Sequence, residues 1–185
     1  MAEIMLVTGG ARSGKSAFAE RRVAAMAEQV GYIATAQAWD EEMRLRIEIH
    51  QQRRPAGWQT FEAPRHAAAV LAKAAAETKA ILFDCLTMFV TNCMCQEDFP
   101  ADPEAGQRYI AKETEALLRA ARQASCPVVF VTNEVGLGIV PDNAMSRAFR
   151  DYAGWVNQQV AAQAQQVFLV VSGLAVDVRR LAEAE

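Results

Sequence analysis

The sequence lacks several features that define other classes of protein. Its 185 residues include only two histidines, and its formal net charge is -3. Without an excess of basic residues, the chain has no electrostatic footprint for nucleic acid. No apolar run approaches the roughly 20 residues that a membrane-spanning helix requires. We therefore expect a protein that binds no nucleic acid and has no membrane span.

Cysteine is also scarce. The four cysteines, Cys85, Cys93, Cys95 and Cys126, lack the spacing of a zinc ribbon and do not form a dense disulfide framework. The first apolar run, residues 4–8, is too short for the hydrophobic part of a signal peptide and has no basic segment before it. These absences predict free thiols in a reducing cytoplasm, with Cys85 and Cys126 packed in or near strands.

What the sequence contains is enough apolar material for one packed domain over residues 1–185. Hydrophobic residues make up 52% of the chain, and a chain of this length buries a substantial core. Short runs of Val, Ile, Leu and Phe without alternation are typical of strands buried on both faces, as in a parallel sheet. Such runs lie at 4–8, 80–84, 127–131 and 167–171, with a weaker candidate at 31–35.

Helices are predicted between these strands, at about 15–29, 38–53, 66–78, 104–124 and 144–165. In residues 112–124, for example, apolar side chains recur at intervals of three and four. Strands that alternate with helices predict an α/β fold, in which a mostly parallel sheet is flanked by helices through right-handed crossovers. Residues 96–106, which contain two prolines, are interpreted as a surface loop.

The first strand leads into a phosphate-binding motif. Residues 4–20 read IMLVTGGARSGKSAFAE and contain the pattern G-x-x-x-x-G-K-[ST], formed by Gly9, Gly14, Lys15 and Ser16. The glycines let the backbone curl until its N–H groups point at phosphate oxygens, and the following helix adds the positive end of its dipole. Lys15 would reach the β and γ phosphates, and Ser16 would offer its hydroxyl to Mg²⁺. A chance glycine-rich turn is the alternative, but a strand before the motif and a helix after it favour nucleotide binding.

A P-loop also needs an acidic residue near the metal ion. Asp84 ends the buried run AILFD, which is the expected Walker B position. The alternative is that Asp84 caps the N-terminus of a helix. Thr87 could serve as that cap instead, which would free Asp84 to hold Mg²⁺ directly or through water. We therefore predict that Ser16 and Asp84 hold the metal ion.

One of the two histidines lies beside a pair of arginines. Residues 46–62 read RIEIHQQRRPAGWQTFE, in which Arg53 and Arg54 follow His50 within four residues. Arginines are suited to gripping phosphate with two hydrogen bonds. Nearby positive charge lowers the pKa of a histidine and so favours the neutral, nucleophilic imidazole. The stretch has what a covalent phospho-histidine or nucleotidyl-histidine site needs, while a general base or a solvated or structural histidine remain alternatives.

Together these motifs resemble one family, the bifunctional adenosylcobinamide kinase / adenosylcobinamide-phosphate guanylyltransferases of cobalamin biosynthesis. The resemblance covers about residues 4–178. The P-loop alone is generic, whereas the runs H-x-x-R-R-P-x-x-W-x-T-x-E and N-E-V-G-L-G-I-V-P are specific to that family. The matching segments are GGARSGKS (9–16), residues 32–62, DCLTMFVTN (84–92), residues 132–161 and VFLVVSGLAV (167–176).

The resemblance implies two reactions. A nucleoside triphosphate phosphorylates the hydroxyl of the aminopropanol arm of adenosylcobinamide, and GTP gives its GMP to a histidine with release of pyrophosphate. Adenosylcobinamide phosphate then takes GMP from that histidine to form adenosylcobinamide-GDP. The resemblance also implies a RecA-like fold, assembly as a homotrimer, and the use of GTP, ATP and Mg²⁺.

The functional residues that the resemblance implies are spread over the first half of the chain. The guanylylated histidine corresponds to His50, and Lys15 of the P-loop is the second residue that we predict to be catalytic. The contacts to the guanine nucleotide correspond to Gly9, Gly10, Ala11, Arg12, Ser13, Gly14, Lys15, Ser16, Thr35, Ala36, Gln37, Gln51, Gln52, Arg53, Arg54, Glu62 and Asp84.

Some points stay open in the sequence. Glu134, in the turn after the run at 127–131, and Asp84 are both candidates to assist the kinase step. The run NEVGLGIVPDN (133–143) is interpreted as a loop that shapes the corrinoid site or a subunit interface, with a purely structural loop as the alternative. The competing functions are a monofunctional P-loop kinase, which has no use for His50 beside two arginines, and a regulatory NTP-binding module without turnover.

Overall fold

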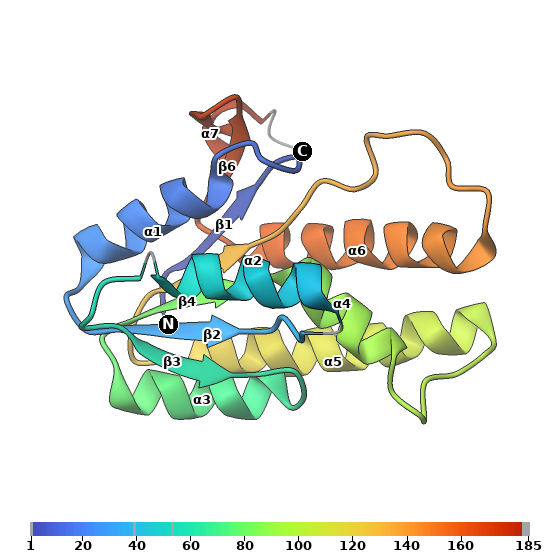
Figure 1. The fold of residues 1–185 in the computed structure, drawn as a ribbon, viewed down its shortest axis with the longest axis horizontal. Helices are drawn as coiled ribbons and strands as arrows, with labels where there is room; N and C mark the ends of the chain where they lie inside the picture. Colours follow the sequence, from blue (N-terminus) through green and yellow to red (C-terminus); the bar gives the residue numbers. More distant parts are fainter. Residues whose placement is uncertain (1, 39, 53, 183–185) are drawn as a thin grey trace.

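The chain folds around a single sheet with helices on both sides (Figure 1). The computed structural model describes residues 2–38, 40–52 and 54–182, except that the side chains at positions 43, 46 and 49–52 lie outside the description. Over these residues the sheet has seven strands in the order β3-β2-β4-β5-β1-β6-β7. The strands are β1 (Ile4–Thr8), β2 (Val30–Ala34), β3 (Gln59–Glu62), β4 (Ala80–Asp84), β5 (Val128–Val131), β6 (Gln166–Val171) and β7 (Leu174–Asp177).

The sheet is mostly parallel, as the apolar runs predict. β1 to β6 pair in parallel, and β7 runs antiparallel to β6. All five predicted strands are present, and every residue of β1, β2 and β5 is buried. The sequence did not predict β3 and β7, which lie at the two edges of the sheet. Both are four residues long and largely outside the core, so they lack the apolar composition of a buried strand.

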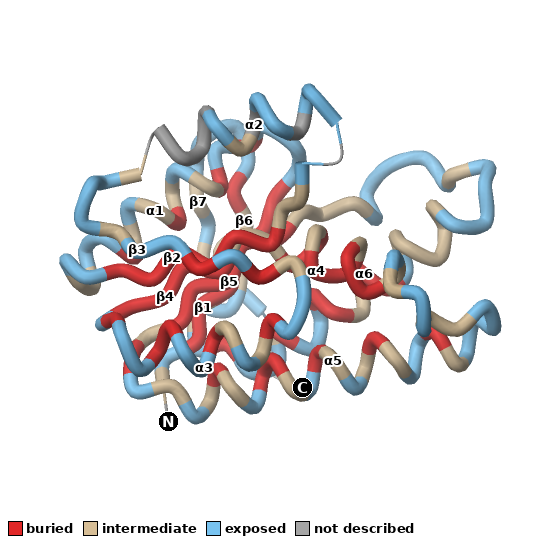
Figure 2. Tube along the Cα trace, turned by 60° about the horizontal axis from the view of Figure 1, so that its bottom comes forward, coloured by how far each residue is buried: buried red, intermediate tan, exposed pale blue. Residues whose placement is uncertain are grey.

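Helices cover both faces of the sheet. The first two lie over one face, and α3, α5 and α6 lie over the other, in both views of the chain (Figures 1 and 2). None of the helices in the described part of the chain combines the length and the apolarity that a bilayer crossing requires. The helices are α1 (Lys15–Met26), α2 (Glu41–Gln52), α3 (Ala67–Glu77), α4 (Leu86–Met94), α5 (Pro103–Gln123), α6 (Ala144–Gln163) and α7 (Val178–Leu181).

The sequence missed α4 and α7 and extended the loop at 96–106 too far, although it placed the start of α5 within one residue. α4 has six buried residues among nine, so no apolar stripe distinguishes it. The predicted loop at 96–106 ends earlier, because Asp102 caps α5 by accepting a hydrogen bond from the Ala105 N–H at 2.8 Å. Pro103 then occupies the first helical position. An aspartate followed by a proline is a helix-start signal, so the sequence contained the correct boundary.

The two faces of the sheet pack against separate cores (Figure 2). Successive side chains of a strand point to opposite faces, so Leu82 packs on the side of α1 while Phe83 packs on the other side. There the rings of Phe83 and Phe130 have centroids 5.3 Å apart. Because the six strands are parallel, their carboxyl ends meet at one edge of the sheet. The predicted P-loop and Asp84 both lie at this edge.

The cysteines are free thiols, as the sequence predicts. Cys85 follows β4 directly, and Cys126 is buried just before β5. Burial, with the charge of Asp84 adding to it, raises the pKa of the Cys85 thiol to about 11. A thiol with a raised pKa is not an activated nucleophile, so the chemistry of this edge depends on other residues.

Candidate active site

The loop between β1 and α1 has the curled backbone that a P-loop needs. Gly9 and Gly14 have positive φ angles of 155° and 94°. A Cβ atom on Gly9 would lie 2.4 Å from the carbonyl oxygen of Val170, so only glycine fits at this position. The Gly173 N–H donates to the Ser13 carbonyl at 2.8 Å, which ties the loop to the turn after β6. The glycines that the sequence singled out are therefore required by the path of the backbone.

The polar side chains of this loop are arranged for an anion. Lys15 is 8% exposed, and its Nζ donates to the Gly10 carbonyl at 3.0 Å. Burial lowers the pKa of Lys15, although the nearby Cys85 and Asp84 oppose this change. The Ser13 hydroxyl is buried and has no hydrogen-bond partner among the described residues. A buried hydroxyl without a partner and a desolvated ammonium group both gain from a phosphate oxygen, which fits a bound nucleotide.

Asp84 ends β4 at the same edge, and it does not cap the next helix. The N-cap of α4 is Cys85, without a side-chain hydrogen bond, and Thr87 is the second residue of the helix. The possibility that Thr87 is the cap is therefore wrong, because α4 begins before it. The Thr87 hydroxyl instead contacts the Cys85 thiol and accepts a hydrogen bond from Asn133, each at 3.0 Å.

The residues at this edge fit a magnesium ion that accompanies a nucleotide. No group of three or more acidic, histidine or cysteine side chains that could hold a metal occurs among the described residues. Mg²⁺ seldom uses such a cage, since it binds one or two protein oxygens and keeps waters and substrate phosphates as its other ligands. The Ser16 hydroxyl, in the first turn of α1, and the Asp84 carboxylate would supply those protein oxygens.

Tyr32, which the sequence did not single out, contacts Asp84. Its hydroxyl donates to Asp84 Oδ2 at 2.5 Å, and its side chain is 3% exposed. Burial and the charge of Asp84 both raise the pKa of this phenol, so it stays protonated and remains a donor. The guanidinium carbon of Arg54 lies 3.5 Å from the centroid of the same ring. A buried tyrosine needs a partner for its hydroxyl, but only the register of β2 and β4 shows which residue that is.

The segment after β2 is fastened to the turn after Asp84. Thr35 is fully buried, and its hydroxyl donates to the Cys85 carbonyl at 3.0 Å and accepts from the Cys85 N–H at 2.7 Å. Asn92 of α4 donates to the Thr35 carbonyl and accepts from the Gln37 side chain. Ala36 lies between these two anchors and is half-buried. Thr35, Ala36 and Gln37 thus border the same edge as Asp84, and the Thr35 side chain is bonded internally, so their contact with a nucleotide stays a prediction.

The histidine stretch lies at the end of α2 and the beginning of β3. His50, Gln51 and Gln52 form the last turn of α2, but their side chains lie outside the described part of the chain, as does the whole of Arg53. Arg54 donates from Nη1 to the Thr60 hydroxyl at 3.0 Å. Glu62 is exposed at the end of β3. The structure therefore brings Glu62 to the same edge as the P-loop and Asp84, and it places Arg54 over the face of β2 and β3, against Tyr32 and Thr60.

Glu134 lies directly beside the P-loop. Its N–H donates to the Gly9 carbonyl at 3.2 Å, and its Oε1 accepts hydrogen bonds from Thr8 at 3.1 Å and from Asn157 at 3.0 Å. The Asn157 Oδ1 in turn accepts from the Thr132 hydroxyl. These bonds fix the carboxylate through Oε1. The sequence identified Glu134 but not Thr8 and Asn157, which act on it from β1 and α6.

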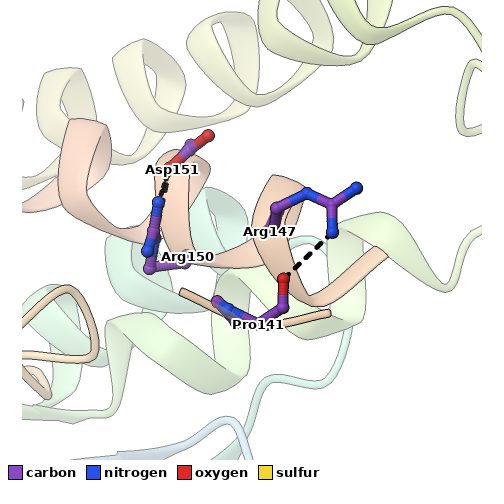
Figure 3. Close-up of polar contacts among 4 residues, drawn as sticks. All are labelled: Pro141, Arg147, Arg150 and Asp151. Atoms are coloured by element: carbon purple, nitrogen blue, oxygen red, sulfur yellow. Dashed lines mark hydrogen bonds and ion pairs between the residues drawn. The ribbon is translucent and has the colours of Figure 1, made fainter. Parts of the chain in front are cut away.

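The loop at 133–143 leaves the sheet and reaches the outer end of α6 (Figure 1). Its end is fastened by Arg147, which donates to the Pro141 carbonyl at 2.9 Å (Figure 3). One turn further along α6, Arg150 pairs with Asp151, as Figure 3 also shows. A hollow of about 860 Å³ lies between this loop, the start of α5 and α6, and Trp155 is among its lining residues.

The comparisons with known proteins agree on one family. A family model described as cobinamide kinase / cobinamide phosphate guanyltransferase matches residues 5–178. Two similar proteins are the bifunctional adenosylcobalamin biosynthesis proteins CobU of Salmonella typhimurium and of Escherichia coli. They are 47% and 44% identical to this chain over 181 residues, which are 95% of this chain and 99% of each relative. The protein CobP of Pseudomonas aeruginosa is 43% identical over 91% of this chain and 93% of its own length.

A solved structure is similar in fold. It is an ATPase from the type III secretion system of pathogenic bacteria, with a TM-score of 0.62 and 11% sequence identity. The match covers 99% of this chain and 59% of that one, so this chain spans less than two thirds of its length. At this identity the likeness concerns the fold alone. It confirms the predicted RecA-like P-loop NTPase fold.

Proposed function

The chain belongs to the cobinamide kinase / cobinamide phosphate guanyltransferase family, and we propose that both reactions use the edge of the sheet that carries the P-loop. Nucleotide binding follows from the family and the fold. Residues 9–16 would hold the triphosphate, with Ser16 and Asp84 on Mg²⁺, and Lys15 would stabilise the charge that develops on the leaving phosphates. The metal would neutralise phosphate charge when bound.

The kinase reaction would transfer the γ-phosphoryl group of ATP to the hydroxyl of adenosylcobinamide. The hydroxyl oxygen forms a bond to phosphorus, the bond to ADP breaks, and the alcohol loses its proton. We propose Glu134 as the acceptor of that proton. Its Oε1 is fixed by Thr8 and Asn157, while no described residue bonds its Oε2. Asp84 is committed through Oδ2 to Tyr32 and would be needed by the metal.

The guanylyltransferase reaction would run through His50. A ring nitrogen attacks the α-phosphorus of GTP, and the bond to pyrophosphate breaks. The phosphate of adenosylcobinamide phosphate then attacks the same phosphorus, and the bond to nitrogen breaks. Arg53 and Arg54 would neutralise the phosphate charge in both steps. The corrinoid phosphate is already an anion, so this second step needs orientation more than a base.

One contact supports this function most directly. Arg54, four residues after His50, packs on the ring whose hydroxyl binds Asp84. The arginine of the histidine stretch and the acid of the Walker B strand therefore share one neighbour, as a single site for both reactions requires. The test is the intact mass of the protein after incubation with GTP and Mg²⁺, which should rise by one GMP. A monofunctional kinase or a regulatory nucleotide-binding module would show no such increase.

We also propose that the chain forms a homotrimer and that the loop at 133–143 contributes to the subunit contact. Leu137 and Ile139 of this loop are 83% and 97% exposed, and Met145, which follows it, is 74% exposed. Apolar side chains gathered at one end of a molecule often mark an interface. The variant Ile139→Asp should lower the molar mass measured by light scattering. An unchanged mass with a raised KM for the corrinoid would instead assign the loop to substrate binding.

A further inference from the structure

Tyr32 contacts both parts of the proposed site. We propose that Tyr32 is a positioning residue, which holds the Asp84 carboxylate with its hydroxyl and the Arg54 guanidinium with its ring, so that metal and phosphate are gripped in one fixed geometry. The two contacts use different parts of the side chain. The Tyr32 hydroxyl oxygen lies 2.5 Å from Asp84 Oδ2, and the ring centroid lies 3.5 Å from the guanidinium carbon of Arg54. This inference rests on the roles proposed above for Asp84 and Arg54.

The register of the sheet explains how Tyr32 reaches Asp84. Tyr32 pairs with Leu82 on β4, and Asp84 is two residues further along that strand. Residues two apart on a strand share a face and are separated by roughly 6.6 Å. The phenol ring spans this distance, so its hydroxyl ends at the carboxylate. With Oδ2 held in this way, Oδ1 is left to face a metal ion, and its orientation no longer depends on a freely rotating side chain.

The register also explains the contact with Arg54. Tyr32 pairs with Thr60 on β3, so the two side chains lie next to each other on the same face. Arg54 lies over both, because its guanidinium stacks on the ring and donates to the Thr60 hydroxyl at 3.0 Å. Trp58 is also close to the ring, with centroids 6.4 Å apart. The Arg54 guanidinium is therefore held by stacking on the Tyr32 ring and by a hydrogen bond to Thr60.

Arg54 retains a donor that nothing in the described structure uses. Its Nε is buried and has no hydrogen-bond partner among the described residues. A buried N–H without an acceptor is costly, and a cationic one is satisfied best by an anion. A phosphate oxygen is the acceptor that the proposed reactions would bring. Tyr32 thus holds an arginine with a buried donor that no described residue satisfies.

Two substitutions separate the two contacts. Tyr32→Phe keeps the ring beneath Arg54 and removes the hydroxyl. We expect the Mg²⁺ concentration at half-maximal rate to rise about 10-fold in both reactions, as for the loss of a group that orients a metal ligand. At saturating Mg²⁺ the rate should recover. Tyr32→Leu removes both contacts, so formation of the GMP adduct should remain about 10-fold slow even at saturating Mg²⁺.

A binding measurement gives a readout that does not depend on turnover. The α,β-methylene analogue of GTP cannot release pyrophosphate, and calorimetry gives its Kd with Mg²⁺ and with EDTA. Tyr32→Phe should raise the Kd measured with Mg²⁺ and leave the Kd measured with EDTA unchanged, whereas Tyr32→Leu should raise both values. Tyr152→Phe is the matched control, because this buried tyrosine donates to the Pro103 carbonyl at 3.0 Å, far along the chain from the P-loop. It should leave both values of Kd unchanged.

Double variants decide between positioning and simple packing. If Tyr32 acts through its two partners, Tyr32→Phe should add little to Asp84→Asn, and Tyr32→Leu should add little to Arg54→Ala. Fully additive effects, or a Mg²⁺ dependence of Tyr32→Phe equal to that of the unsubstituted protein, would overturn the inference and leave Tyr32 as a core residue. If Asp84→Asn and Arg54→Ala themselves had no effect, the roles proposed for those residues would fail first.

Discussion

Glu62 and Asp84 lie in one row of the sheet, since each pairs in register with Ala34 of β2. Paired residues of parallel strands present their side chains on the same face, so both carboxylates belong to the face that α1 covers. Two strand spacings, roughly 9.6 Å, separate the two positions. Asp84 is the nearer to the P-loop, which supports a role at the metal and phosphates. Glu62 is at the outer edge, which supports a role at the nucleoside end.

The first prediction concerns Lys15, whose pKa is lowered by burial. The unfolded chain binds this proton more tightly than the folded chain, so Lys15 destabilises the folded protein at neutral pH. This destabilisation is fully present below the pKa that Lys15 has in the folded protein, and it disappears as the pH rises towards the ordinary pKa of 10.5. Lys15→Met should therefore raise the melting temperature of the nucleotide-free protein at pH 7, on the order of 2 °C, and the difference should shrink at pH 10.

The same variant should lose activity. Because both reactions are proposed to use one triphosphate cradle, Lys15→Met should slow phosphorylation and guanylylation by at least about 100-fold each. The measurements are corrinoid phosphate formed from ATP and protein-bound GMP formed from labelled GTP. Guanylylation at the unsubstituted rate would require a second nucleotide site and would contradict the proposal.

The parts of the fold that the sequence predicted are those whose signal is local. β1, β4 and β5 are continuous apolar runs, and the P-loop is defined by the spacing of its own residues. The edge strand β3 has one buried residue, Phe61, and becomes a strand only because β2 lies beside it. Its formation depends on tertiary pairing, which a single segment does not reveal.

The residues of the candidate site also differ in whether a local pattern in the sequence identifies them. Lys15, Ser16 and Asp84 belong to motifs, so their residue types and spacing identify them. Tyr32 matters because its hydroxyl meets Asp84 from the neighbouring strand, 52 positions away in the sequence. Asn157 meets Glu134 across 23 positions in the same manner. Such partners are determined by strand register and helix packing, and no local pattern in the sequence indicates them.

Asp84→Asn should make the enzyme demand more Mg²⁺. The amide still accepts the Tyr32 hydrogen bond at one oxygen but lacks the negative charge that a hard cation prefers. We expect the half-maximal Mg²⁺ concentration to rise about 10-fold or more, with part of the activity restored at high Mg²⁺. An unchanged titration curve would mean that Asp84 serves only to bind Tyr32.

Thr35→Val should destabilise the protein. Thr35 is fully buried, and the substitution leaves the Cys85 N–H without the acceptor that it now has at 2.7 Å. We expect a loss of about 1–3 kcal/mol in the free energy of unfolding, measured by urea denaturation. Thr114→Val is the matched control, because Thr114 is 1% exposed and its hydroxyl has no partner among the described residues. It should be neutral or stabilising, and equal losses in both variants would contradict the role of Thr35.

Glu134→Gln should slow the kinase reaction alone. The amide oxygen still accepts from Thr8 and Asn157, so the loop should keep its place, but the group no longer takes up a proton. We expect phosphorylation of adenosylcobinamide to fall about 100-fold, while the GMP adduct forms normally with GTP. The fall in the kinase rate at low pH, which reports protonation of the base, should also disappear. Equal losses in both reactions would assign Glu134 to the shape of the P-loop.

His50→Ala should give the opposite separation. Phosphoryl transfer to an alcohol relies on positioning and charge stabilisation, which the P-loop, Mg²⁺ and Asp84 would supply without a histidine. GMP transfer through a covalent intermediate requires its nucleophile. Guanylylation should therefore be lost, while phosphorylation of adenosylcobinamide remains at least in part. Both assays are made on one purified sample, whose circular dichroism confirms that it is folded.

The arginine beside this histidine refines the test. Arg54→Ala keeps the nucleophile and removes a charge that would stabilise the phosphate, so the adduct should still form, but at least about 10-fold more slowly. Covalent GMP at the unsubstituted level in His50→Ala would rule out His50 as the nucleophile. Loss of both activities in folded His50→Ala would instead assign His50 to the shared nucleotide site, as a binding or general-base residue. In that case Arg54 would act only as a phosphate contact, and any GMP adduct of the unsubstituted protein would have to form on a side chain other than His50.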